Sequence, residues 1–257
     1  MRIWALPIVL FVLAGCAAQP VPRRQAAVVR PRVSAETLAK RLVAQQADWP
    51  RRRRYDCGRI KCVALTFDDG PGPYTGKLLD LLHKREVRAT FFVLGQMVAA
   101  DPGARFTRRI VDEGHEIGNH SWSHPALTGL SPEGVRHELG QTEELVRRLT
   151  GVRMRMMRPP YGSTDDRVAA ETRREGLAQI LWDVDTLDWL HRRPEAVVRA
   201  AATAKAGSIV LMHDIHPTTV EAVPKVLDTL SRKGFTFVTV SELYGRTPAP
   251  GRTYTAR

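Results

Sequence analysis

The sequence predicts an α/β fold whose parallel β-sheet curls into a closed or nearly closed barrel. From residue 62 onward, apolar stretches of strand length alternate with amphipathic stretches of helix length. Such alternation is typical of a parallel sheet. About seven strand–helix units favour a barrel, with an open doubly wound sheet as the alternative. In either case we expect the functional site at the carboxyl ends of the strands.

Seven segments are expected to form strands and seven to form helices. The expected strands are 63–67, 89–93, 116–118, 154–157, 178–182, 208–212 and 235–238. The expected helices are 76–85, 105–113, 132–149, 165–175, 194–204, 220–233 and 241–244. Two helix starts are marked by a proline at the first helical position, one after Ser131 and one after Arg193.

The positive charge is confined to the N-terminal part of the chain. The 257 residues carry a net charge of +12. Residues 22–61 hold 12 Lys and Arg against 3 Asp and Glu, whereas residues 62–257 hold 26 against 24. Since the body of the protein is close to neutral, we expect no nucleic-acid partner. A hydrophobic content of 43% is enough for one sizeable core. We therefore expect a single catalytic domain at 57–245 and a C-terminal tail at 246–257.

The N-terminus has the features of an export signal. Residues 3–13 are apolar but too few for a permanent membrane span. They end in Leu-Ala-Gly-Cys16, which resembles a bacterial lipobox, in which the cysteine is lipidated; an ordinary cleaved signal is the alternative. We expect a lipoprotein signal peptide at 1–16, a basic Pro/Arg/Ala-rich stem at 17–56, and a monomer anchored in the cell envelope by its lipid.

The remaining cysteines agree with export. Cys57 and Cys62 can close a small loop directly before the first strand, and disulfides persist in oxidising compartments. Two free thiols are the alternative. A zinc knuckle is excluded because no further cysteines complete the set.

Polar side chains follow the strands, where the carboxyl ends of a parallel sheet meet. The pairs are, in order, Asp68 and Asp69, His120 and His124, Arg158 and Tyr161, Asp185 and Asp188, and His213 and Asp214. One Asp-Asp-Gly triplet alone is most often a turn. Five polar pairs at the same end of successive strands predict a functional site instead.

Each pair has a chemistry that its residue types can perform. His120 and His124 with one carboxylate form a common catalytic zinc arrangement. Arg158, held by two following prolines, can clamp a carboxylate and keep it ionised. His213 ends a buried strand and is suited to be a general acid. Trp189 offers an aromatic face for a sugar ring, or belongs to the core. The sequence contains no G-x-S-x-G motif, which argues against a serine esterase.

Five ordered stretches resemble the five motifs of polysaccharide deacetylases, the NodB-homology domain of carbohydrate esterase family four. They are 66–71, 120–124, 158–162, 185–189 and 211–214, and the likeness covers roughly residues 62–245. The resemblance implies a distorted seven-stranded (β/α) barrel and a metal-dependent N- or O-deacetylase.

The family pattern also implies a role for each matching residue. Asp68 would be the general base, paired with Arg158. The backbone N–H of Tyr161 would stabilise the oxyanion, and Asp188 would tune the general acid His213. The implied metal ligands are Asp69, His120 and His124; Trp189, Leu211 and Tyr161 would line the substrate pocket.

The motifs specify the acetyl group more than the sugar. We expect an N-acetylglucosamine polymer as the substrate, with peptidoglycan favoured, and chitooligosaccharide, exopolysaccharide or acetylxylan as alternatives. The metal is expected to be zinc, although the same ligands accept cobalt, nickel or manganese. An inactive carbohydrate-binding lipoprotein is the alternative from another class.

Overall fold

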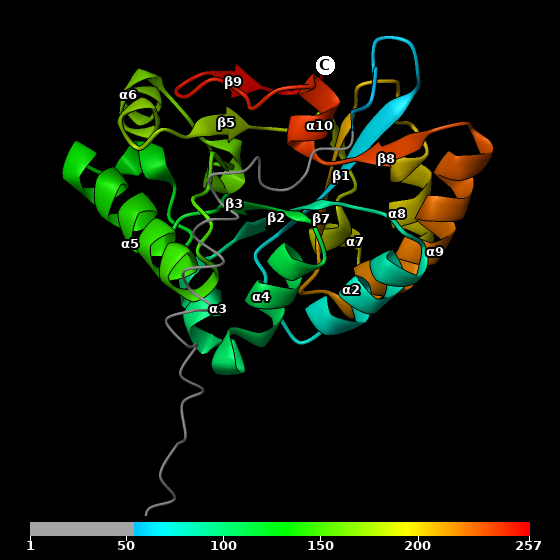
Figure 1. Cartoon of the computed structure of the whole chain (residues 1–257), viewed down its shortest axis with the longest axis horizontal. Coiled ribbons are helices and arrows are strands. Elements are labelled where there is room, and N and C mark those ends of the chain that lie inside the picture. Colours follow the sequence, from blue (N-terminus) through cyan, green and yellow to red (C-terminus); the bar gives the residue numbers. More distant parts are fainter. Residues whose placement is uncertain (1–53) are drawn as a thin grey trace, which may run out of the picture. The chain divides into compact units, whose positions relative to one another are not determined.

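The computed structural model describes residues 54–257 (Figure 1). The expected signal peptide, the lipidation site Cys16 and residues 17–53 of the stem lie outside the described residues.

Within residues 54–257, nine strands form one curled sheet in which every strand pairing is parallel. The order is β6–β7–β1–β2–β3–β4–β5–β9, and β8 pairs with the first part of β1. The sheet path ends at β6 and β9, so the sheet is a half-barrel. The strands are β1 (Cys62–Asp68), β2 (Thr90–Val93), β3 (Glu116–Asn119), β4 (Met156–Met157), β5 (Ala178–Ile180), β6 (Val184–Asp185), β7 (Ile209–His213), β8 (Thr236–Val238) and β9 (Thr253–Tyr254).

All seven expected strands are present, and the α/β barrel-like fold is confirmed. The two additional strands, β6 and β9, have two residues each, too few to show an alternating pattern. Strand β9 lies in the segment that we expected to be a tail. Strand β9 and the residue before it accept hydrogen bonds from β5 and the residue after β5: Gln179 N donates to Arg252 O, and Leu181 N donates to Tyr254 O. The tail therefore extends the sheet.

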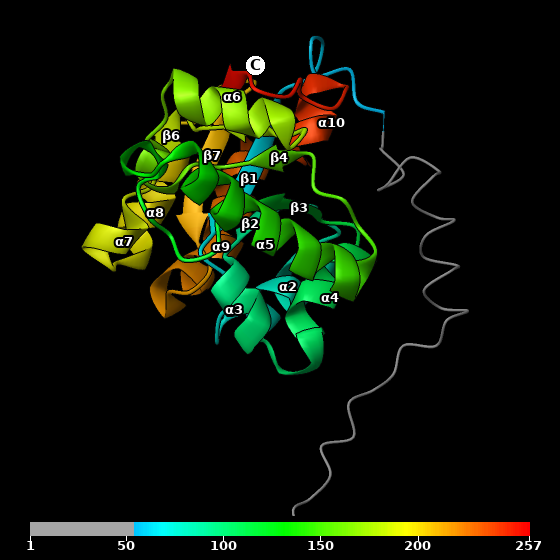
Figure 2. The same cartoon turned by 90° about the vertical axis from the view of Figure 1, so that its left-hand side faces the viewer.

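The helices cover the outside of the sheet. Helices α8, α9, α2, α4, α5 and α6 pack side by side in that order (Figures 1 and 2). Their bounds are α2 (Thr75–Lys84), α4 (Arg105–Asp112), α5 (Pro132–Thr150), α6 (Asp166–Arg174), α8 (Pro194–Ala201) and α9 (Pro217–Arg232). Shorter helices are α3 (Gly95–Ala100), α7 (Asp188–His191) and α10 (Val240–Tyr244), with 3₁₀ turns at η1 (Pro102–Ala104), η2 (Leu127–Gly129) and η3 (Pro160–Gly162).

All seven expected helices form. As expected, Ser131 caps α5, and its side chain accepts a hydrogen bond from Gly134 N. Helix α9 begins at Pro217, three residues before the expected start. Helices α3 and α7 were not expected, because six and four residues are too short to show helical periodicity.

Strand β1 is the centre of the core. All seven of its residues are buried. Val63, Leu65 and Phe67 belong to a large hydrophobic cluster, while Cys62 and Ala64 belong to a smaller one. Because side chains alternate along a strand, the two clusters lie on opposite faces of the sheet. Cover on both faces explains the continuous apolar run in the sequence.

A disulfide joins Cys57 to Cys62 and closes the loop before β1. Among the described residues, no helix is both long and apolar enough to cross a membrane.

Candidate active site

Two adjacent carboxylates mark the end of the central strand. Asp68 is the last residue of β1 and is 2% exposed. Asp69 has a φ of 69°, in the left-handed region that non-glycine residues seldom adopt. This conformation breaks the alternation of the strand, so both carboxylates reach the same histidine. His120 Nε2 lies 3.8 Å from Asp68 Oδ2 and 3.4 Å from Asp69 Oδ1.

Asp69, His120 and His124 form a cluster suited to a metal ion. Their ligand atoms all lie within 4.8 Å of one another, with His124 Nε2 3.5 Å from Asp69 Oδ1. Asp69 Oδ1 is buried and has no hydrogen-bond partner among the described residues. A buried carboxylate oxygen that faces two imidazole nitrogens fits a divalent cation, because the cation supplies the charge that the oxygen lacks.

The state of His120 also fits a metal ligand. Its Nδ1 lies 2.7 Å from the backbone oxygen of Arg158, which fixes the proton on Nδ1 and leaves the lone pair of Nε2 directed at the cluster. Burial lowers the pKa of His120 to about 3, so the ring is neutral at physiological pH. Metal ligation requires the neutral form.

Arg158 is fully buried and holds Asp68. Its Nη1 donates to Asp68 Oδ1 at 2.9 Å and to Thr66 Oγ1 at 2.7 Å. Two backbone carbonyls at the end of β5 accept from its other nitrogens, those of Ile180 and Leu181. The guanidinium lies 4.4 Å from the centre of the Phe92 ring. Burial raises the pKa of Asp68, and the charge of Arg158 partly offsets this rise. The result is an oriented carboxylate that retains affinity for a proton.

His213 is oriented by hydrogen bonds to the carboxylate of Asp188. Its Nδ1 lies 2.8 Å from Asp188 Oδ1, and its backbone N–H donates to Asp188 Oδ2 at 2.7 Å. Thr219 Oγ1, from α9, donates to the same Oδ2. Burial alone would lower the pKa of His213, but the hydrogen bond and charge of Asp188 outweigh it and raise the pKa to about 9. The ring is therefore protonated at neutral pH, with Nε2–H left to act as a donor.

The sheet register brings Asp68 and His213 together. They are direct partners in the pairing of β1 with β7. Adjacent strands lie about 4.8 Å apart, so a carboxylate and an imidazolium are neighbours at this edge of the sheet.

Exposed apolar side chains lie around this end of the sheet. Tyr161 is 71% exposed with a φ of 60°, and its ring packs edge-on against His124 at 4.6 Å between centres. Trp189 and Leu190 are also exposed. Leu211, expected to line a pocket, is 4% exposed in β7. Trp189 is thus on the surface and not in the core.

Asp185 and Asp214 lie at the same end of the sheet. Neither forms a hydrogen bond with the Asp68–Arg158 pair or with the Asp188–His213 pair. Asp185 Oδ1 accepts a hydrogen bond from Leu187 N, which is a local turn contact. Asp214 is buried and accepts a hydrogen bond from Thr75.

Sequence reasoning missed the role of Thr219, and it included Thr66 only as part of a motif. A single threonine in the first turn of a helix gives no signal of its own. Both contacts depend on segments that are distant along the chain.

Comparisons with known proteins agree with this geometry. The family model "Polysaccharide deacetylase" matches residues 56–180. The peptidoglycan-N-acetylglucosamine deacetylase PgdA of Listeria monocytogenes is 44% identical over 196 residues, which cover 76% of this chain and 41% of PgdA. The chitooligosaccharide deacetylase of Bradyrhizobium sp. is 36% identical over 211 residues, covering 75% of this chain and 95% of that protein. The solved structure "T48 deacetylase with substrate" is 46% identical with a TM-score of 0.74, covering 78% of this chain and 99% of that one.

The chain belongs to the polysaccharide deacetylase family, a class of hydrolases. It spans about two fifths of the length of the Listeria relative.

Proposed function

We propose that the protein hydrolyses N-acetyl groups on N-acetylglucosamine residues of a polysaccharide, with peptidoglycan as the favoured substrate. The observation that carries the proposal is the pairing of Asp68 with His213 on adjacent strands, beside the cluster of Asp69, His120 and His124. Hydrolysis of an amide needs a base for the attacking water and an acid for the departing nitrogen. Both groups are present next to one metal-ligand set.

Asp69, His120 and His124 would hold a divalent metal, with zinc favoured and cobalt, nickel or manganese as alternatives. When bound, such an ion polarises a carbonyl and makes water more acidic.

The chain's own residues would move the protons. Asp68, oriented by Arg158, takes a proton from the water that attacks the acetyl carbon. The backbone N–H of Tyr161 donates a hydrogen bond to the developing oxyanion. His213, kept protonated by Asp188, gives its Nε2 proton to the amide nitrogen as the C–N bond breaks. The products are acetate and an amino sugar.

The substrate choice rests on the relatives. PgdA of Listeria is named for peptidoglycan N-acetylglucosamine, and the Bradyrhizobium protein is named for chitooligosaccharide. The second of these is the main alternative substrate, followed by an exopolysaccharide or acetylxylan. The exposed Trp189 and Tyr161 offer apolar faces for sugar rings.

We also propose that the protein is an envelope lipoprotein, lipidated at Cys16 and joined to its catalytic domain by the basic stem. The lipobox-like sequence supports this part of the proposal. A monomeric protein held at the membrane would work beside the peptidoglycan that it modifies.

The test measures acetate released by the domain, residues 54–257, from peptidoglycan, chitooligosaccharides and acetylated xylan in parallel. Each assay is run with zinc, with a chelator, and with Asp68→Asn as the control. We expect metal-dependent release from peptidoglycan that the variant lacks. Release from chitooligosaccharide alone would favour the alternative substrate, and no release with metal bound would favour an inactive binding protein.

A further inference from the structure

The two ends of the sheet differ strongly in charge. The described loops that lead from a helix to the next strand, together with residues 54–61 and 245–257, hold twelve Lys and Arg against four Asp and Glu. We call this surface the basic face. The loops that lead from a strand to the next helix, together with the connection between α7 and α8, hold three arginines, Arg158, Arg192 and Arg193, against three aspartates. The domain is therefore polarised, with its positive end opposite the candidate active site.

The last turns of the helices add to the same face. Basic residues occupy the last turn of α2, α5, α6 and α9, and these helices all end there. The C-terminal segment lies along it as well, since Gly251 N donates to Leu177 O and Arg257 N to Gly207 O. Basic residues at helix ends are common, because they complement the helix dipole. Charge alone would therefore not single out a membrane as the partner.

A second feature, the disulfide loop 57–62, distinguishes the possible partners. Among the described residues, four large hydrophobic side chains are exposed, and three of them, Tyr161, Trp189 and Leu190, lie around the candidate active site. The fourth is Ile60, 41% exposed, at the opposite end of β1. Strand β1 has seven residues, so this loop and Asp68 are about 20 Å apart.

The loop is built to hold Ile60 outward. The disulfide closes it, and both Arg59 N and Ile60 N donate to Asp56 O, at 2.9 and 3.0 Å. The neighbours of Ile60 are the exposed cations Arg59 and Lys61. An apolar tip between two cations matches an anionic lipid surface, where the tip enters the acyl boundary and the cations meet phosphate groups.

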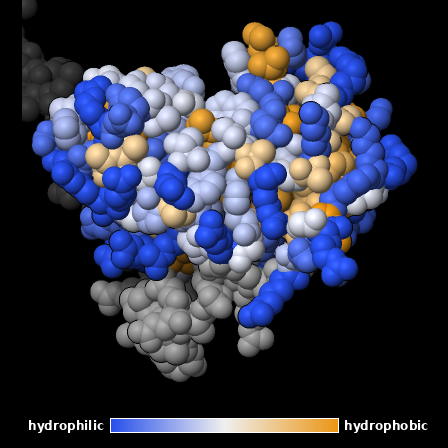
Figure 3. Space-filling view, turned by 90° about the horizontal axis from the view of Figure 1, so that it is seen from above, coloured by the Kyte–Doolittle hydropathy of each residue, from blue (hydrophilic) through white to orange (hydrophobic). Residues whose placement is uncertain are grey.

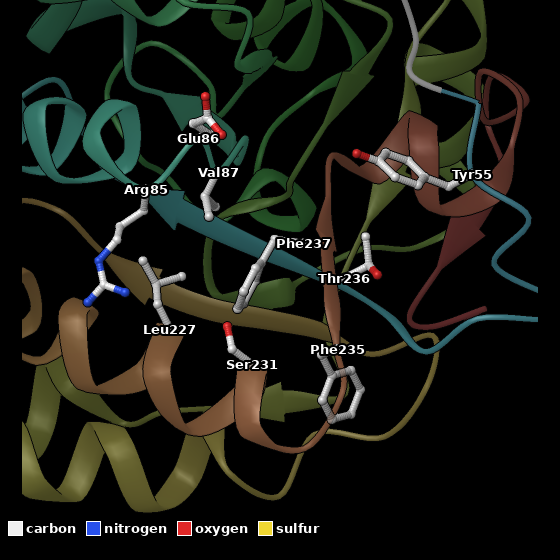
Figure 4. A pocket seen from close by; sticks show the side chains of 9 residues that line it. All are labelled: Tyr55, Arg85, Glu86, Val87, Leu227, Ser231, Phe235, Thr236 and Phe237. Atoms are coloured by element: carbon white, nitrogen blue, oxygen red, sulfur yellow. The ribbon is translucent and has the colours of Figure 1, made fainter.

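A cavity beside the loop adds half-buried aromatic surface to the basic face. It has a volume of about 370 Å³ and contains none of the candidate catalytic residues. Tyr55, Phe235 and Phe237 line it together with Arg85 (Figure 4). Of these residues, tyrosine is a type that is enriched at membrane–water interfaces. Seen from above the view of Figure 1, the surface is mainly hydrophilic, with its hydrophobic residues in separate spots (Figure 3). This pattern fits a surface that lies on lipid better than one that is buried in it.

We propose that the basic face, with Ile60 at its tip, docks on an anionic phospholipid surface. The described chain begins at Arg54, next to this loop, so a lipid-anchored stem would join the domain on the membrane side. The candidate active site then points away from the lipid, toward a polymer outside the membrane. This inference goes beyond the proposed reaction and does not depend on it.

The test uses residues 54–257 without the stem, so that no lipid anchor contributes to binding. These residues contain the sheet and the hydrophobic core described above. In the solved deacetylase structure, 99% of the chain matches this protein, so that structure consists of the same domain. Binding is measured by cosedimentation with vesicles of phosphatidylcholine alone and with vesicles of equal parts phosphatidylcholine and phosphatidylglycerol. We expect binding only to the anionic vesicles, and weaker binding as salt is raised.

Two variants separate charge from apolar contact. Arg153→Glu with Arg155→Glu reverses two exposed cations of the basic face, and should weaken binding by at least about tenfold. Ile60→Ser should weaken it severalfold without changing the net charge. The matched control, Lys77→Glu with Lys225→Glu, makes the same charge change at exposed positions of α2 and α9 outside their last turns and should bind far more tightly than the first variant.

Three results would overturn the proposal. They are equal binding to neutral vesicles, an equal loss in the control variant, and binding to soluble poly(glycerol phosphate) without binding to vesicles. The last result would assign the basic face to an anionic wall polymer. Acetate release from peptidoglycan is measured for every variant and should be unchanged. A domain that binds vesicles but releases no acetate would contradict the proposed function and leave this inference intact.

Discussion

Nδ1 of His213 lies 2.8 Å from Oδ1 of Asp188, a carboxylate that is fully buried. The pair is held from two further directions, by the backbone N–H of His213 and by the hydroxyl of Thr219. Although burial acts to raise it, these contacts keep the pKa of Asp188 below its ordinary value. The carboxylate therefore stays ionised and can stabilise the imidazolium.

Asp188→Asn should move the alkaline limb of the pH profile of kcat/KM to lower pH, by at least about one unit. His213 must be protonated to act as an acid, and its pKa of about 9 depends on the charge of Asp188. Without that charge, burial lowers the pKa and the acid form is lost earlier as the pH rises. The control is Asp185→Asn, whose carboxylate caps Leu187 N and does not contact His213. An unchanged alkaline limb in Asp188→Asn would remove this role.

Asp68→Asn should lower kcat by about 10²–10⁴, because an amide cannot accept the proton of the attacking water. The hydrogen bond to Arg158 can be kept by the amide oxygen, so the fold should be preserved. Turnover is measured on peptidoglycan, with circular dichroism as a check on folding. Asp80→Asn, at a side chain that is 72% exposed, serves as the control. A near-wild-type rate in Asp68→Asn would contradict its role as the base.

His120→Ala or His124→Ala should weaken zinc binding by more than about a hundredfold. Loss of a partner that only orients a ligand already costs 10–100-fold, and these residues supply ligand atoms directly. Affinity is measured by isothermal titration calorimetry on the chelator-treated domain. His137→Ala, at an exposed position of α5, should bind zinc as the wild type does. Unchanged affinity in both site variants would disprove the ligand assignment.

Glu143→Gln should stabilise the domain above pH 7, by about 1–2 kcal/mol after allowance for partial exposure. Burial raises the pKa of Glu143 to about 7, and its Oε1 is buried without a hydrogen-bond partner among the described residues. Since the folded state holds this proton more tightly than the unfolded state, wild-type stability falls as the pH rises from about 4.5 to 7. The variant should lack this part of the pH dependence.

The measurement is the free energy of unfolding in urea at several pH values. Glu144→Gln is the matched control, because its neighbouring carboxylate is exposed and pairs with Arg148 at 3.7 Å. A parallel pH dependence in the wild type and in Glu143→Gln would show that the Glu143 carboxylate is hydrated in solution.

The fold class and the residue types of the site can be predicted from local patterns in the sequence. The run Val63–Phe67 is apolar at every position, because β1 is covered on both faces. Polar pairs follow the strands because the carboxyl ends of parallel strands meet at one edge. Both signals are local, since they depend on residue type and spacing along a few residues.

Which side chains of the site contact one another depends on packing between segments that are distant along the chain. Arg158 contacts Asp68 across 90 positions of the chain, and Thr219 contacts Asp188 across 31. The left-handed φ of Asp69 and the strand formed by the expected tail likewise depend on packing between distant segments. Neither periodicity nor propensity records such contacts, because both describe neighbours along the chain. Ile60 and Asp68 lie at opposite ends of the domain because strand β1 separates them. Charge is concentrated on the basic face because the loops from helix to strand all lie at that end of the sheet.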